Sequence, residues 1–348
     1  SRTGQRVALC ILIYFTFVEW SVALVHWNLN ALLFGLITSS KIVYVSFCLI
    51  LFSELAQRRI LSLSCFERWM VIYGTVVSIF VLLAYTSGFH IANYSKGIAT
   101  RGLFISGNGL GVVIGSCALV LIHRLRSFGI IALFHISLLL VTTALIGTKA
   151  ALVFSLFSAS YLSLKIVSRH PIFFIFTACV FSYYLVSPLL EILNSVFENI
   201  IFKFNKIDNK WTLLASSRDV FIIDAFKQVT WNSFYAIRLL TGAGGYFGYL
   251  DPLGNFSSMR KLLENDLFEL FFCYGLFAVL SYIILYLYGV VKALFYKCFF
   301  YFFLFSLIFM HSISAGHVVF NGTSSIMLAL TFGAIISQTT KFRKKSSV

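Results

Sequence analysis

The stretch "ENDLFELFFCYGLFAVLSYIILYLYG", residues 264–289, places acidic side chains immediately before and inside a long apolar run. After Glu269 no charged residue follows as far as Gly289. The hydrocarbon core of a bilayer is about 30 Å thick, so a helix needs about 20 mostly apolar residues to cross it. The stretch therefore predicts a transmembrane helix with acids in its first turn.

The rest of the chain repeats this apolar pattern. Of its 348 residues 59% are hydrophobic and 11% charged, and the mean hydropathy is +0.92. Proline occurs three times, and no alternating barrel-type strands are present. We therefore expect an all-α polytopic membrane protein of about ten transmembrane helices, forming one integral membrane domain over residues 1–348. The apolar runs lie near 7–25, 31–53, 70–89, 102–122, 129–146, 149–166, 171–189, 266–289, 298–312 and 318–338.

The basic residues predict the orientation of these helices. With a cytoplasmic N-terminus, alternate short connections and the C-terminal tail hold fifteen of the 27 Lys and Arg residues. This bias is typical of cytoplasmic loops and places both termini in the cytoplasm. It also accounts for much of the net charge of +15, so we expect no nucleic-acid partner. Lys41 interrupts the second run, so either it faces a polar cavity or that span starts later and is short.

The acidic residues gather in one region. Nine of the twelve Asp and Glu residues lie between 191 and 269, largely in a polar segment at 190–265 that joins the seventh and eighth runs. By the charge-based topology this segment faces outward, and loops of this length are usually functional. Within it, Ile222, Phe226 and Val229 have helical spacing, which predicts a helix at the membrane interface.

Glu264 and Asp266 have two interpretations. As first-turn acids they would stabilise the positive end of the helix by about 0.3–1 kcal/mol. As catalysts they would act as a general base beside a membrane-embedded substrate. Glu269 lies one turn further in, where an acid is costly unless it faces a cavity or a partner.

Four cations, Arg101, Lys149, Arg218 and Arg238, fall on the predicted outer side, against the topological bias. Arg101 could anchor the chain to lipid headgroups, or its guanidinium could bind phosphate oxygens. A shared anionic ligand would explain all four, and so would anionic lipid.

Two glycine-rich segments also have alternative interpretations. In "SGNGLGVVIG", residues 106–115, glycines recur every four residues, which favours close packing of a neighbouring helix over nucleotide binding. Asn108 within it could bind a ligand or bond to a backbone carbonyl. "TGAGGYFGY", which contains Tyr246, is either a turn or a close backbone approach to substrate. His311 and His317 lie near the outer ends of the last two spans and are either structural or functional.

The seven cysteines show no CxxC pair and no zinc-ligand spacing, so they are interpreted as small buried hydrophobic residues. We expect no metal and no other cofactor.

In order, "RGLFISGNGLG", "GTKAAL", "SSRDVFIIDAFKQ", "LLTGAGGYFG", "ENDLFELFFCYGLF" and "SAGHVVFNG" resemble the O-antigen polymerase and ligase superfamily, specifically its Wzy-type polymerases. The resemblance covers about 250 residues from Arg101 onward. It implies a membrane glycosyltransferase of the GT-C type, in the bacterial inner membrane with its active site on the periplasmic face. The implied substrates are undecaprenyl-pyrophosphate-linked oligosaccharides as donor and acceptor, and a flippase and a chain-length regulator of the same pathway are candidate partners.

The resemblance also assigns roles to residues. Glu264 and Asp266 become the candidate catalytic pair. Arg101, Arg218, Arg238, Lys149, Asn108, Tyr246 and His317 become candidate ligands of the pyrophosphate or glycan. Ligases of the superfamily typically carry a histidine where this chain has Glu264, so the polymerase is the first hypothesis, with a glycan ligase or a transporter of lipid-linked sugars as alternatives.

Overall fold

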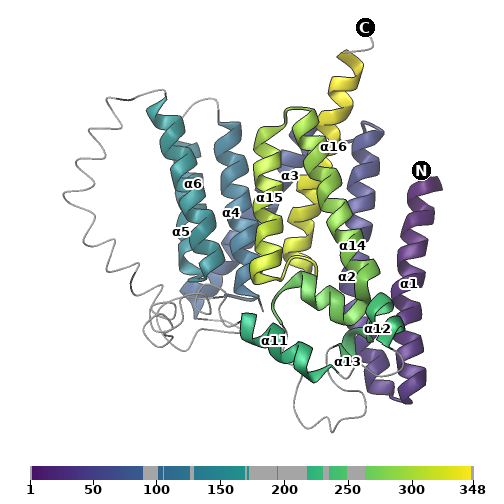
Figure 1. Ribbon diagram of the computed structural model, residues 1–348. Coiled ribbons are helices and arrows are strands. Elements are labelled where there is room, and N and C mark those ends of the chain that lie inside the picture. Colours follow the sequence, from purple (N-terminus) through teal and green to yellow (C-terminus); the bar gives the residue numbers. More distant parts are fainter. Residues whose placement is uncertain are drawn as a thin grey trace. The chain divides into compact units, whose positions relative to one another are not determined.

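The computed structural model describes residues 2–88, 101–104, 106–125, 129–168, 171, 194, 218–229, 235–248 and 263–345, and its regular elements in these ranges are all helices (Figure 1). The predicted span 171–189 and much of the predicted loop lie outside them. The chain divides into two compact units, residues 1–66 with 209–348 and residues 67–208, and each is described by itself.

The first unit contains long apolar helices and three short ones. Its long helices are α1 (Arg2–His26), α2 (Leu29–Gln57), α14 (Asp266–Phe295), α15 (Phe299–Ala315) and α16 (Gly322–Lys345). Its short helices are α11 (Arg218–Gln228), α12 (Tyr235–Thr241) and α13 (Gly244–Phe247). Helix α2 packs against α1 and α16, and α14 packs against α15 and α12. The short helices lie at the end of this unit where α14 begins (Figure 1). We call it the acidic end, because Glu264, Asp266 and Glu269 lie there.

The second unit contains most of α3 (Leu63–Ser87), together with α4 (Gly107–Arg124), α5 (Ile130–Leu145) and α6 (Lys149–Val167). Helices α4 and α6 lie very close. A Cβ on Gly111 would come 2.7 Å from the Ala151 nitrogen, and a Cβ on Gly115 would overlap the Phe154 side chain. The predicted packing role of these two glycines is confirmed.

Six described helices, α1, α2, α3, α4, α6 and α14, are long and apolar enough to cross a membrane, and α5 and α15 are shorter apolar helices. The protein is therefore an all-α membrane-embedded protein, as predicted. Helix α2 starts at Leu29, where the Asn28 side chain accepts a hydrogen bond from Ala31 N–H, and runs unbroken past Lys41. The side chain of Lys41 is exposed on this continuous helix.

Two local predictions need correction. The loop helix predicted from Ile222, Phe226 and Val229 ends at Gln228, so Val229 lies just after it, and a separate helix, α12, starts at Tyr235. Of the six described cysteines, all are free and four are buried, but Cys10 is exposed and Cys65 is half-buried. The packing of Cys10 is therefore unlike that expected of a buried hydrophobic residue.

Candidate functional site

The acidic end of the first unit is organised around one ion pair. Arg218 opens α11, and its Nη2 donates to Glu264 Oε2 at 2.7 Å. The two side chains differ in burial, since that of Arg218 is 9% exposed and that of Glu264 is 44% exposed. A buried guanidinium therefore holds a carboxylate that remains open to an approaching molecule.

The backbone around Glu264 explains this placement. Glu264 has a φ of +53°, a conformation that a side chain makes unfavourable. Asn265 follows as the N-cap of α14, accepting from Phe268 N–H at 3.2 Å and donating to the Ile313 carbonyl. Gly316 lies against this bend, and a Cβ there would come 2.6 Å from the Glu264 carbonyl carbon. The N-cap is therefore Asn265. Asp266 lies in the first turn of α14, where an acid complements the positive helix end, and Glu264 precedes the cap.

Asp266 has a different environment from Glu264. It is 2% exposed, and its Oδ2 accepts hydrogen bonds from Ser312 Oγ at 2.7 Å, Val318 N–H at 2.9 Å and Val319 N–H at 3.0 Å. These donors lie on α15 and in the segment that leads to α16. Asp266 thus joins three separate parts of the unit, and its Oδ2 is committed to protein donors.

Glu269 is paired with a backbone donor, as a buried acid in an apolar helix requires. It is buried, and its Oε2 accepts from the Leu263 N–H at 3.2 Å. The carboxylate therefore satisfies a backbone donor of the chain that enters α14. Leu263 itself packs in an apolar cluster with Ala225 and Val229 of the α11 segment and with Phe272 of α14. This cluster fixes α11, and hence Arg218, beside the start of α14.

Two histidines lie close to the ion pair. His317 is half-buried with a φ of +62°, and its carbonyl accepts from Ser324 Oγ. His311 is 7% exposed and lies within electrostatic reach of both Arg218 and His317. Its Nε2 is buried and meets no hydrogen-bond partner among the described residues. The structure thus groups His311 and His317 with Arg218 and Glu264.

Arg238 and Tyr246 belong to the glycine-rich segment at the same end of the unit. Arg238 donates from Nη2 to the Gly248 carbonyl at 2.9 Å, which closes this segment on itself. Tyr246 is half-buried and packs edge-on against Phe34 and Phe247, with ring centroids 5.8 and 5.1 Å away.

The glycines of this segment make close approaches, but to protein. A Cβ on Gly242, which has a φ of +77°, would overlap the backbone of Cys273 and Tyr274. Gly275 of α14 has a φ of +71° and meets the backbone of Leu240 in the same way. Glycine at both positions lets the segment cross a kink in α14, so neither a simple turn nor an approach to substrate is needed to explain it.

Glu19 was missed by the sequence reasoning. It is 1% exposed on α1, and its Oε1 accepts from Gly245 N–H at 2.8 Å and from the Tyr274 hydroxyl at 2.7 Å. It thereby fastens the glycine-rich segment and the kinked part of α14 to α1. A single acid inside an apolar run was the available signal, because such residues are costly without a partner.

The remaining predicted residues belong to the second unit. Arg101 and Lys149 are half-buried. Arg101 lies six residues before the start of α4, and Lys149 is the first residue of α6. Asn108 is half-buried in the first turn of α4, whose N-cap is Ser106. Helices α4 and α6 run in the same direction, as their contacts Gly111–Ala151 and Gly115–Phe154 require, so these three residues lie at one end of the unit.

The predicted site residues therefore form two groups. Glu264, Asp266, Arg218, Arg238, Tyr246 and His317 lie at the acidic end of the first unit, and Arg101, Asn108 and Lys149 lie at one end of the second. Only Glu264 combines a free approach with a cationic partner. No protein-family model matches this chain, and no curated protein shows significant sequence similarity to it.

Proposed function

We propose that this protein is a membrane glycosyltransferase of the GT-C type, which polymerises undecaprenyl-pyrophosphate-linked oligosaccharide repeats at the periplasmic face of the bacterial inner membrane. The observation that carries the proposal is the exposed carboxylate of Glu264, held at 2.7 Å by the buried guanidinium of Arg218 where a membrane helix begins. A site at this level suits a substrate whose anchor is in the membrane and whose sugar is in water.

The proposed reaction uses both members of the pair. The acceptor hydroxyl attacks the anomeric carbon of the donor glycan, and a new C–O bond forms. The bond from this carbon to the pyrophosphate oxygen breaks, and its electron pair leaves with the pyrophosphate. Glu264 accepts the hydroxyl proton, a step that contributes typically 10²- to 10⁴-fold to the rate.

Arg218 couples the two halves of this reaction. In the resting pair its charge faces the Glu264 carboxylate. When that carboxylate takes up a proton it becomes neutral, and the guanidinium charge is then available to the pyrophosphate as negative charge develops there. Guanidinium suits this task because it stays protonated and matches phosphate oxygens with two N–H groups.

The other candidates take supporting roles. A polymerase handles two pyrophosphates, one on the donor and one on the acceptor. Arg101 and Lys149 are our candidates for a second anion contact, and Asn108 at the same end of the second unit is a further candidate. Arg238 and Tyr246 are candidates for glycan contacts. His317 is a second candidate base, because it lies in the same cluster as Glu264.

Within the superfamily that the sequence resembles, the acid at position 264 favours a polymerase over a ligase. Ligases typically carry a histidine there. A ligase that transfers the glycan to another acceptor, such as lipid A-core, is the second candidate.

The test is an assay of purified protein in liposomes that contain only the lipid-linked repeat unit. We expect a ladder of products that differ by one repeat. If the protein makes no ladder but glycosylates lipid A-core, the ligase is the correct function. If the lipid-linked unit crosses the bilayer with its glycan unchanged, the protein is a transporter.

A further inference from the structure

His311 is a buried polar residue that the proposed reaction does not use. It lies in the last turns of α15, and its side chain is 7% exposed. Its Nε2 meets no hydrogen-bond partner among the residues that the structure describes. A buried nitrogen without a partner loses the hydrogen bonds that it would make to water, which costs free energy. An unsatisfied group of this kind points to a partner from outside the chain, either a ligand or a water molecule.

Two other histidines on apolar helices have the partner that His311 lacks. His123 is hydrogen-bonded through Nδ1 to the Tyr161 hydroxyl at 2.9 Å. His135 is hydrogen-bonded through Nε2 to Thr75 Oγ1 at 2.7 Å. The helices of this chain can therefore supply a partner for a buried imidazole, and among the described residues they supply none for Nε2 of His311.

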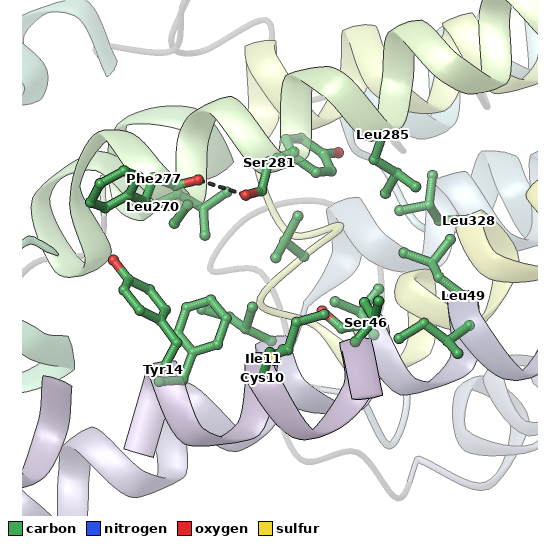
Figure 2. A pocket seen from close by; sticks show the side chains of 18 residues that line it. Cys10, Ile11, Tyr14, Ser46, Leu49, Leu270, Phe277, Ser281, Leu285 and Leu328 are labelled. Atoms are coloured by element: carbon green, nitrogen blue, oxygen red, sulfur yellow. Dashed lines mark hydrogen bonds between the residues drawn. The ribbon is translucent and has the colours of Figure 1, made fainter. Parts of the chain in front are cut away.

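The apolar cavity of the first unit does not explain the unpaired nitrogen. This cavity has a volume of about 550 Å³ and lies between α14 on one side and α1 and α2 on the other (Figure 2). Its walls include Leu270, Phe277 and Ile11, and His311 is not among the described residues that line it. The partner of Nε2 therefore belongs to the acidic end, where His311 has charged neighbours.

Those neighbours favour an anion. Arg218, whose guanidinium is paired with Glu264 at 2.7 Å, and His317 both lie within electrostatic reach of His311. A further positive charge beside them is unfavourable, so the imidazole of His311 stays neutral, with one N–H donor and one acceptor nitrogen. A negatively charged oxygen suits these surroundings better than water, because it accepts the N–H and is attracted by the nearby guanidinium.

We infer that His311 is a ligand of the pyrophosphate leaving group and donates its Nε2–H to a pyrophosphate oxygen beside Arg218. The inference rests on the proposed function, to which it adds a residue of α15. As the bond to the anomeric carbon breaks, negative charge grows on the pyrophosphate, and a donor fixed in advance stabilises that charge. The imidazole keeps its proton throughout, so the leaving group departs as the anion and no proton is transferred at this position.

The experiment uses the full chain in nanodiscs and measures the binding of inorganic pyrophosphate by calorimetry. His311→Leu removes the donor, and His311→Gln replaces it with an amide N–H. His311→Met is a second apolar variant if His311→Leu does not fold. His135→Leu is the matched control, because it removes an imidazole that has a protein partner. Thermal unfolding without ligand is measured for each variant.

We expect His311→Leu to bind pyrophosphate about 10- to 100-fold more weakly than the wild type, because a hydrogen bond to a charged group is lost. His311→Gln should recover most of the affinity. Without ligand, His311→Leu should unfold at the wild-type temperature or above it, because Nε2 has no partner to lose among the described residues. His135→Leu should show the reverse, a lower unfolding midpoint and an unchanged affinity.

The inference is overturned if a folded apolar variant of His311 keeps the wild-type affinity, or if both apolar variants unfold as early as His135→Leu. Competition identifies the source of the bound group. Polyprenyl pyrophosphate should displace inorganic pyrophosphate from the wild type, and phosphatidylglycerol should not. Equal displacement by phosphatidylglycerol would show a general site for lipid head groups and would also overturn the inference.

A parallel polymerisation assay separates this inference from the proposed function. If the wild type makes a ladder and His311→Leu makes it at the same rate, the role of His311 is wrong and the polymerase stands. If His311→Leu loses affinity for pyrophosphate but the wild type extends no lipid-linked repeat, His311 is a pyrophosphate ligand and the polymerase is wrong.

Discussion

Exchanging each carboxylate of the pair Glu264 and Asp266 for its amide should give opposite results. The side chain of Glu264 is 44% exposed and has one ion-pair partner, whereas Asp266 is 2% exposed and accepts three hydrogen bonds. The first should therefore matter for turnover, and the second for stability.

In Asp266→Asn the amide oxygen can take the place of Oδ2 and keep the three donors, but the negative charge is lost and a buried NH₂ group takes the place of Oδ1. A hydrogen bond to a charged group contributes about 1.5–3 kcal/mol and one between neutral groups about 0.5–1.5 kcal/mol, so we expect a loss of about 1–3 kcal/mol. Glu264→Gln keeps an acceptor for the buried Arg218 guanidinium, and the side chain that changes is itself 44% exposed, so we expect little change in stability.

Both variants can be followed with two assays. A thiol-reactive dye reports thermal unfolding in detergent, because Cys273 and Cys298 are buried, while the exposed Cys10 gives a constant background. Ladder formation from lipid-linked repeats reports turnover per folded protein. We expect Asp266→Asn to lower the unfolding midpoint by several degrees, and Glu264→Gln to keep the midpoint and lose 10²- to 10⁴-fold in rate.

Two results would refute this reasoning. A wild-type rate for Glu264→Gln would remove Glu264 as the base. A wild-type midpoint for Asp266→Asn, combined with a large loss of rate, would show that the buried acid carries the chemistry and that its hydrogen bonds are not what holds the acidic end together.

Three further predictions test the site and its support. Arg218→Ala and Arg101→Ala should each abolish polymer while the protein remains folded in the membrane. Arg218→Lys should make only part of the wild-type amount of polymer, because an ammonium cannot make two parallel N–H contacts. Full-length polymer from both alanine variants would show that neither arginine binds the pyrophosphate. Gly316→Ala should lower the unfolding midpoint, because Gly316 has a φ of +64° and the new Cβ would come 2.6 Å from the Glu264 carbonyl carbon. Gly129→Ala should leave the midpoint unchanged, because no atom lies within 4 Å of its new Cβ. Equal midpoints for the two variants would show that the backbone at Glu264 can relax. Glu19→Leu should destabilise the protein by about 2 kcal/mol or more, because two buried donors lose their acceptor, and Glu19→Gln by less; thermal unfolding of both variants measures this, and a neutral Glu19→Leu would rule out the anchor.

The fold was predictable because each membrane helix can be recognised from its own stretch of sequence. Each described long helix contains or overlaps an apolar run recognised in the sequence, since crossing a membrane requires about 20 successive apolar residues. The close packing of α4 against a neighbouring helix was equally predictable. Glycines at four-residue spacing leave one helix face without side chains, so another helix can approach its backbone. The kink at Gly275 was not, because the segment that crosses it lies about 30 residues earlier in the chain.

The candidate site was predictable in its residues and not in its arrangement. Acidic and basic residues inside or beside apolar runs are easily recognised in a sequence that has so few charged residues. Glu264 and Asp266 differ in their hydrogen-bond partners. Arg218, the partner of Glu264, lies 46 residues earlier in the chain, and Ser312, a partner of Asp266, lies 46 residues later. Glu19 became visible as an anchor only through Gly245 and Tyr274.

Composition and charge thus predicted a helical membrane protein and a functional end rich in acids, because burial in lipid constrains each residue through its own chemistry. Only the three-dimensional packing distinguished the exposed carboxylate of Glu264 from the buried carboxylate of Asp266 and formed an apolar cavity between α1, α2 and α14. Hydrogen bonds and cavities depend on which distant segments come together.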